Sequence, residues 1–190
     1  AKAEAAASAN KQNSSSSSSN SSSNSSSGSS SSSGGSNSSG GSTVASDDVT
    51  LLAAILQCEA RYDYESMLAV ATVIMNRVNV STGEYARISQ NGSVRNIIFQ
   101  AGQFDCATDN LFGRYNSQNI YNMNPTDIHY YIADWALSGN KLPEIGECLW
   151  YLNPFSPNCE NTFPRNGSGT FHTRLGDHCF YRPTSQYENT

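Results

Sequence analysis

The sequence has few histidines and no paired metal-binding motif. Its 190 residues include three histidines, at positions 129, 172 and 178. Neither a His-Glu-x-x-His pair nor a Cys-x-x-Cys pair occurs, which argues against a helical zinc site and excludes a zinc ribbon. We therefore expect the protein to work without a metal ion and without any other cofactor.

Long apolar runs and clusters of basic residues are also missing. No stretch approaches the roughly 20 apolar residues of a transmembrane helix, so we expect no membrane insertion. The net charge is -5, and the Lys and Arg residues are scattered along the chain. Nucleic-acid binding needs a basic surface that neutralises phosphates. We therefore expect no nucleic-acid partner.

The first quarter of the chain lacks aromatic residues, and its one aliphatic residue larger than alanine is Val44. Residues 13–46 are almost entirely Ser, Asn and Gly. Such a segment cannot bury enough apolar surface to offset its backbone entropy. The sequence thus predicts an Ala-rich start and a disordered linker over residues 1–46, followed by one folded domain over residues 47–190.

Two features of the N-terminal region favour export from the cell. Ala1-Lys2-Ala3 fits the small-residue pattern of a signal-peptidase site. Ser-rich tethers commonly join an exported catalytic domain to a surface module. We therefore expect a secreted protein.

The five cysteines form an odd set. Cys58 is interpreted most simply as a buried thiol. Cys148 and Cys159 bracket a short aromatic segment and can close it as a disulfide, although reduced thiols fit the sequence equally well.

A carboxylate stands on the apolar face of the first predicted helix, residues 51–61. The apolar stripe of this helix consists of Leu52, Ile55 and Leu56, and Glu59 follows in the same line. Apolar surroundings disfavour the charged form of a carboxyl group and raise its pKa, as a general acid near neutral pH requires. In the alternative, Glu59 ends the helix and points to water, or pairs with Arg61.

The rest of the domain places helices first and short strands last. Ser46-Asp47-Asp48 can cap the first helix, and Gly83 is expected in a loop after the second. Further helices are predicted over residues 64–78 and 125–138, the latter with Ile128, Tyr131, Ile132 and Trp135 on one face. Short aromatic strands are predicted over residues 149–152, 169–172 and 178–181. This order indicates an α+β domain with a small antiparallel sheet.

Four stretches of the folded part carry a family pattern. They are Glu59-Ala60-Arg61 at a helix end, residues 68–78, residues 97–104, and Asn153-Pro154 together with residues 175–181. Together they resemble the cell wall hydrolase family of the SleB/CwlJ type, which includes the spore cortex-lytic enzymes. Residues 113–124 have no counterpart in that pattern.

The resemblance implies a compact lysozyme-like domain that cleaves the glycan strands of peptidoglycan, and we expect the protein to be a monomer. It implies a lytic transglycosylase, secreted or associated with the cell wall or spore, with Glu59 as the catalytic acid. Such an enzyme needs no second carboxylate. That agrees with the spacing, which puts none of five acidic residues on the face of Glu59: Asp63, Glu65, Asp105, Glu147 and Asp177.

The candidate substrate-binding residues are a turn amide and residues of the aromatic strands: Gln103, Tyr151, His178 and Tyr181. Aromatic faces stack on sugar rings, but Trp150 and Phe171 show the same alternation, and the sequence does not separate core rings from exposed ones. In a purely structural role, the Gln103 amide would stabilise its turn. In the corresponding role, His178 would be a strand residue bonded to a carbonyl.

Four alternatives stay open at this point. One is a hydrolytic muramidase or glucosaminidase, which needs a second carboxylate. Another is an N-acetylmuramoyl-L-alanine amidase with an irregular zinc site at His172 and His178. A Cys-His hydrolase would use Cys58 or Cys179. The non-enzymatic alternative is a wall-binding module.

Overall fold

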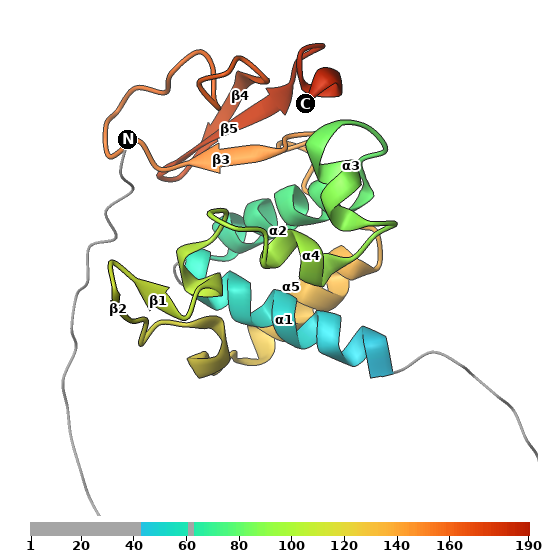
Figure 1. Cartoon of the computed structure of the whole chain (residues 1–190), viewed down its shortest axis with the longest axis vertical. Coiled ribbons are helices and arrows are strands. Elements are labelled where there is room, and N and C mark those ends of the chain that lie inside the picture. The colour runs from blue at the N-terminus through green and yellow to red at the C-terminus, as the bar shows by residue number, and fades with distance from the viewer. Residues whose placement is uncertain (1–42, 61–62) are drawn as a thin grey trace, which may run out of the picture. The chain divides into compact units, whose positions relative to one another are not determined.

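The computed structural model describes residues 43–60 and 63–190 of the chain. The predicted linker up to residue 42 and the proposed role of Arg61 lie outside these residues, whereas residues 43–46 of that linker are helical. Within these described residues, five α-helices pack beneath one small sheet, with a short hairpin beside the end of the first helix (Figure 1). The predicted α+β fold, helices first and antiparallel sheet last, is confirmed. No described helix combines the length and apolar character needed to cross a membrane.

The first helix, α1 (Thr43–Glu59), begins earlier than the sequence suggested. Ser46-Asp47-Asp48 lie inside it, so the prediction that they cap it is wrong. The residues just before them carry no helix-breaking side chain, and the nearest upstream glycines in the sequence are Gly40 and Gly41. The apolar stripe of Leu52, Ile55 and Leu56 is fully buried, as expected.

Helix α2 (Tyr64–Asn79) forms the centre of the core, as predicted, and is buried from Ser66 to Val78. Asp63 caps its start by accepting hydrogen bonds from the backbone N–H of Ser66, at 3.0 Å, and from the Ser66 hydroxyl. These bonds hold the pKa of Asp63 below its usual value.

Two polar residues near the end of α2 fasten this helix to the segment that leads into the sheet. The Asn76 amide donates to the carbonyl oxygens of Gly146 and Cys148, at 2.7 and 3.0 Å. Nε of Arg77 donates to the carbonyl of Leu149 at 2.6 Å. Buried polar groups of this kind stabilise only when they are bonded, and here their bonds set where the next strand begins.

The segment after α2 is more helical than expected, because Gly83 starts α3 (Gly83–Ser89) and is not a loop residue. Helix α4 (Val94–Ile98) follows. Gly83 is at φ +69°, and a Cβ there would lie 2.7 Å from the Tyr187 ring. This position therefore needs glycine both for its backbone and for its packing.

Helix α5 (Asp127–Leu137) buries a different face from the predicted one. Tyr131 is 58% exposed and Ile128 is 38% exposed. The buried residues are His129, Ile132, Ala133 and Ala136. Helix α5 packs on α1, and the small side chains of Ala133 and Ala136 allow that close approach. The buried face is therefore set by packing on α1 and not by where the large apolar residues are most numerous.

The sheet consists of β3 (Trp150–Leu152), β4 (Gly169–Leu175) and β5 (His178–Pro183), in the antiparallel order β3-β5-β4. Its register places Tyr151 opposite Phe180 and Trp150 opposite Tyr181. The hairpin of β1 (Asn110–Leu111) and β2 (Arg114–Tyr115) was not predicted. The short 3-10 helices are η1 (Asp105–Ala107), η2 (Ile120–Asn122) and η3 (Tyr187–Asn189).

One disulfide links Cys159 to Cys179, with a Cα–Cα distance of 5.8 Å. The suggested Cys148–Cys159 pair is therefore wrong. The register of β3 and β5 sets Cys179 beside Leu152, beyond the position of Cys148. Cys148 is instead a free, fully buried thiol that packs in a cluster with Phe180.

Candidate active site

Glu59 is the last residue of α1, and its half-buried side chain lies among groups from three other parts of the chain. The Tyr151 hydroxyl donates to Oε2 at 3.2 Å. The Cys106 thiol lies 3.8 Å from Oε1, as a donor. The alternative in which Glu59 swings out to water is therefore wrong.

The pKa of Glu59 is raised to about 7. Burial is the main cause, because it disfavours the charged carboxylate. The hydrogen bond from Tyr151 lowers the pKa, the negative charge of Asp105 raises it, and Cys106 and the positive charge of Arg77 lower it. The expected rise in pKa is confirmed, and it leaves the carboxyl group close to half protonated at neutral pH.

Tyr151 and His178 reach the same face of the sheet. Tyr151 lies opposite Phe180, and His178 precedes Phe180 by two residues, so the side chains of all three share one face. The His178 ring meets the Tyr151 ring edge-on, at a centroid distance of 5.5 Å. The structure thus brings two of the four predicted substrate-binding residues together, and one of them, Tyr151, contacts Glu59.

Tyr181 lies on the opposite face, because it is one position further along β5 and pairs with Trp150. Its side chain is fully buried, with the Phe163 and Phe171 rings 5.4 and 6.1 Å away. Its ring therefore has no free face for a sugar, which contradicts its prediction as a substrate contact. Of the two unassigned rings, Trp150 is buried and Phe171 is 40% exposed.

Gln103 stands in the turn after α4. Its backbone N–H donates to the Gln100 carbonyl at 3.2 Å, and its side-chain oxygen accepts from the Tyr85 hydroxyl at 3.3 Å. The side chain is partly exposed. The turn-stabilising interpretation is therefore supported by these bonds, which tie the turn to α3.

Arg77 is a buried cation near the end of α2 that was not among the predicted site residues. Its guanidinium lies over the Tyr85 ring at 4.9 Å and over the Phe104 ring at 5.6 Å. Its charge acts on Glu59 and stabilises the carboxylate form. The Asn-Arg pair at the end of an otherwise apolar helix was the signal that could have identified it.

Asp105 and Cys106 come to Glu59 from η1, more than 40 positions further along the chain. The buried amide of Asn116 holds this segment, donating to the carbonyl oxygens of Asp105 and Thr108 at 3.0 Å each. No local sequence pattern indicates these contacts, because they depend on how the loop folds back onto α1.

The other acidic candidates have different surroundings. Asp63 caps α2. Glu147 forms a 3.3 Å ion pair with Lys141, and the Glu65 and Asp177 side chains are exposed.

Each histidine has its own structural contacts. His129 completes the capping box of α5 with Thr126. Nε2 of His172 lies 3.0 Å from the Glu144 carbonyl and 2.9 Å from the Arg182 guanidinium. Among the described residues, the one group of three or more possible metal ligands contains no histidine and consists of Cys58, Glu59 and Cys106. The zinc amidase alternative based on His172 and His178 therefore gains no support.

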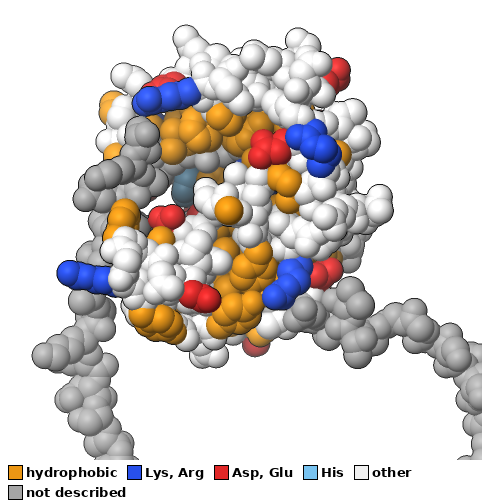
Figure 2. Space-filling model, in the orientation of Figure 1, with side chains coloured by type: hydrophobic (Ala, Val, Ile, Leu, Met, Phe, Trp, Pro, Cys, Tyr) orange, Lys and Arg blue, Asp and Glu red, His pale blue; other side chains and the backbone are white. Residues whose placement is uncertain are grey.

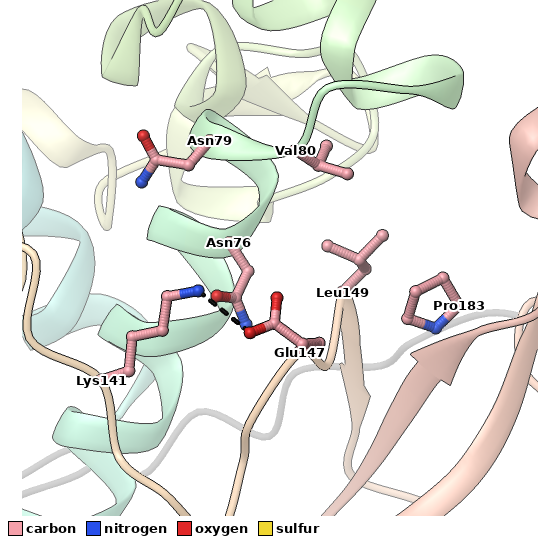
Figure 3. A pocket seen from close by; sticks show the side chains of 7 residues that line it. All are labelled: Asn76, Asn79, Val80, Lys141, Glu147, Leu149 and Pro183. Carbon is pink, nitrogen blue, oxygen red and sulfur yellow. Dashed lines mark hydrogen bonds and ion pairs between the residues drawn. The ribbon is translucent and has the colours of Figure 1, made fainter.

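The surface near the sheet is hollowed, with hydrophobic side chains along one edge and acidic side chains within it (Figure 2). A separate pocket lies between the end of α2 and the sheet, away from Glu59 (Figure 3). Its lining includes none of the residues bonded to Glu59 and consists of Asn76, Asn79, Val80, Lys141, Glu147, Leu149 and Pro183. We therefore place the candidate site at Glu59 and not in this pocket.

Comparison with known proteins identifies the family of this chain. The fold is similar to the catalytic domain of the germination-specific lytic transglycosylase SleB from Bacillus anthracis, with a TM-score of 0.53 and 25% sequence identity over 76% of this chain and 98% of that one. No sequence among the curated proteins matches. A family model described as Cell Wall Hydrolase matches residues 62–181, which include Tyr151 and His178 and begin three residues after Glu59. This chain belongs to the cell wall hydrolase family.

Proposed function

We propose that the protein is a peptidoglycan lytic transglycosylase in which Glu59 acts first as acid and then as base. The observation that carries this proposal is the Glu59 carboxyl itself, buried at the end of α1 with a pKa of about 7. A group that is close to half protonated at neutral pH can both give and take a proton in one cycle.

In the first step, protonated Glu59 gives its proton to the glycosidic oxygen as the bond from that oxygen to the muramic C1 breaks. In the second step, the 6-hydroxyl of the same sugar attacks C1 and its proton passes to the Glu59 carboxylate. The product is a 1,6-anhydro sugar, no water is consumed, and Glu59 returns to its starting form. One carboxyl group therefore suffices.

Tyr151 is proposed to position Glu59. Its hydroxyl bond to Oε2 fixes one carboxyl oxygen and stabilises the carboxylate formed after the first proton transfer. We propose that the partly exposed His178 ring, which packs on Tyr151, borders the bound glycan. Gln103 is proposed as a more distant sugar contact, through the part of its amide that does not bond Tyr85.

A hydrolytic muramidase is the second candidate, and Asp105 is the observation that favours it. Its charge raises the pKa of Glu59, so a second carboxylate lies within electrostatic reach. A hydrolase would use such a group to activate water or to form a covalent intermediate. Asp105 is exposed, whereas Glu59 lies among groups from three other parts of the chain.

We further propose that the enzyme acts outside the cell on wall or spore peptidoglycan. The support is the family and the likeness to a germination-specific enzyme.

The decisive experiment is digestion of purified peptidoglycan by the full chain and by Glu59→Gln, followed by mass spectrometry of the soluble fragments. We expect 1,6-anhydromuramic ends from the wild type and none from the variant. Reducing muramic ends would support the hydrolase with Asp105, and free stem peptides would support an amidase.

A further inference from the structure

Two cysteine thiols flank Glu59, and the transglycosylase mechanism uses neither of them. Cys58 precedes Glu59 on α1, and Cys106 comes from η1. The sulfur atoms of both and a carboxylate oxygen of Glu59 all lie within 4.8 Å of one another. Two soft donors and one hard donor thus converge from separate elements on a single point.

We propose that Cys58, Glu59 and Cys106 form a zinc-binding site whose occupation blocks Glu59. This inference deepens the proposed function, because it makes the catalytic group also a metal ligand and so makes the enzyme subject to zinc inhibition. The three protein donors leave the fourth position of a tetrahedral ion to water.

The spacing of the donors suits a tetrahedral zinc ion. With Zn–S near 2.3 Å and Zn–O near 2.1 Å, the sulfur and oxygen ligands of one ion stand about 3.6 Å apart. The distance from Cys106 Sγ to Glu59 Oε1 is 3.8 Å. Small side-chain rotations therefore suffice to bring these atoms onto a shared ion.

The segment that carries Cys106 is held in place without a metal. Asn116 bonds the carbonyls of Asp105 and Thr108, and the Asn119 amide donates a further bond to the Thr108 carbonyl at 3.0 Å. The other two ligands share a helix end. A site whose ligands are already positioned loses little conformational entropy on binding.

The electrostatics of the cluster also favour a dication. Two thiolates and one carboxylate whose ligand atoms lie within 4.8 Å of one another repel when all three are charged. An ion bound between two thiolates and a carboxylate removes that repulsion and releases the protons. The ligands and zinc together carry one negative charge, which Arg77 offsets and the exposed Asp105 adds to. Thiolate ligands favour zinc over magnesium or calcium.

The first test is direct metal binding by the full chain, with Cys58 and Cys106 shown to be thiols by alkylation and mass spectrometry. Cobalt(II) is the probe, since thiolate ligation produces a charge-transfer band in the near ultraviolet, and zinc should abolish this band by displacement. We expect one ion per chain. Absence of the band, or a Cys58–Cys106 disulfide in the purified chain, would overturn the proposal.

Variants assign the ligands. Each of three variants, Cys58→Ala, Cys106→Ala and Glu59→Gln, should weaken metal binding by about 100-fold or more. The loss of an outer-shell partner of a metal ligand can already cost that much, and the loss of a ligand should cost at least as much. Cys148→Ala is the matched control, because Cys148 is a free thiol outside the cluster, and its binding should be unchanged. Cys58 is partly exposed, so its replacement should disturb the fold less than that of buried Cys106. Cys58→Ala therefore still tests the site if Cys106→Ala does not fold. Unchanged binding in Cys58→Ala would contradict the site.

Inhibition of wall lysis by zinc distinguishes the proposed zinc site from the proposed catalytic role of Glu59. Zinc should stop wall lysis by the wild type, and the inhibitory concentration should rise in Cys58→Ala in step with its weaker binding. Zinc bound by these ligands without loss of lysis would support the site and count against Glu59 as the catalytic acid.

Discussion

The Tyr151 hydroxyl donates a hydrogen bond to Oε2 of Glu59 across 3.2 Å, and this contact joins the end of α1 to β3. Burial pushes the pKa of Glu59 up while this bond pulls it down, and the pKa of about 7 reflects both effects. Asp105 and Arg77 add opposing charges on the same carboxyl group. The proton affinity of Glu59 is thus adjustable from both directions by substitutions outside Glu59 itself.

Glu59→Gln should abolish wall lysis and leave the fold intact. Glutamine keeps the shape and hydrogen bonding of the side chain but has no proton to donate. General acid-base assistance is worth roughly a hundred- to ten-thousand-fold in rate, and because one group serves both steps, the loss should reach the upper end. Turbidity loss of wall sacculi is the measurement, with circular dichroism as the control for folding. Substantial lysis by the folded variant would remove Glu59 from the mechanism.

Tyr151→Phe should raise the pKa of Glu59, because the lost hydrogen bond is one that stabilises the carboxylate. The first step needs protonated Glu59, so the fall of kcat/KM at alkaline pH should move to higher pH. The rate should also fall by about tenfold or more, as expected for a lost hydrogen bond to a charged group. A pH profile of fragment release measures both effects. An unshifted profile would mean that Tyr151 does not act on Glu59.

Asp105→Asn should shift the same profile in the opposite direction. Removing the negative charge of Asp105 makes the Glu59 carboxylate less unfavourable and lowers its pKa. We expect a rate within about tenfold of wild type, since transglycosylation requires no second carboxylate, with Asp177→Asn as the exposed control. A loss as large as that of Glu59→Gln would instead identify Asp105 as the second carboxylate of a hydrolase.

Folding stability should depend on the ionisation of Glu59. Its pKa is higher in the folded state than the ordinary value of 4.5, so the folded protein binds more protons between these two pKa values. This contribution to stability is therefore complete below about pH 4.5 and is lost as the pH rises to about 7. Glu59→Gln should gain relative to the wild type over that range, by up to about 3 kcal/mol. Urea unfolding of both proteins at about pH 5 and about pH 8 measures the difference, and an equal difference at both would contradict the raised pKa.

Removal of metal ions should not impair catalysis. The proposed mechanism uses only a carboxyl group and the sugar hydroxyl, and zinc at Glu59 is expected to inhibit. Dialysis against a strong chelator should therefore leave wall lysis unchanged or raise it. Complete loss of lysis that zinc restores would instead support a metal-dependent enzyme.

Several elements follow from local pattern alone. The spacing of apolar residues predicts α2 almost to its ends, and aromatic segments separated by Pro, Asn and Gly predict the three strands of the sheet. Helical periodicity also places Glu59 on the buried face of α1, because one stripe of a helix must face the core whatever that core contains. The fold class and the candidate acid were therefore accessible from sequence.

Other features depend on partners that lie far away in the chain. Strand register decides that Tyr151 and Tyr181 lie on opposite faces of the sheet, since a shift of one residue between β3 and β5 would put both on one face. Packing on α1 decides which face of α5 is buried.

The same holds for the cysteines. Sequence gives their number, but the path of the loops pairs Cys159 with Cys179 and brings Cys106 to Glu59. Sequence by itself determined α2, the three strands of the main sheet and the place of Glu59 in the apolar stripe of α1, because these depend on local periodicity. Only the tertiary structure decided which side chains surround that acid, because contacts between distant segments depend on how the whole core packs.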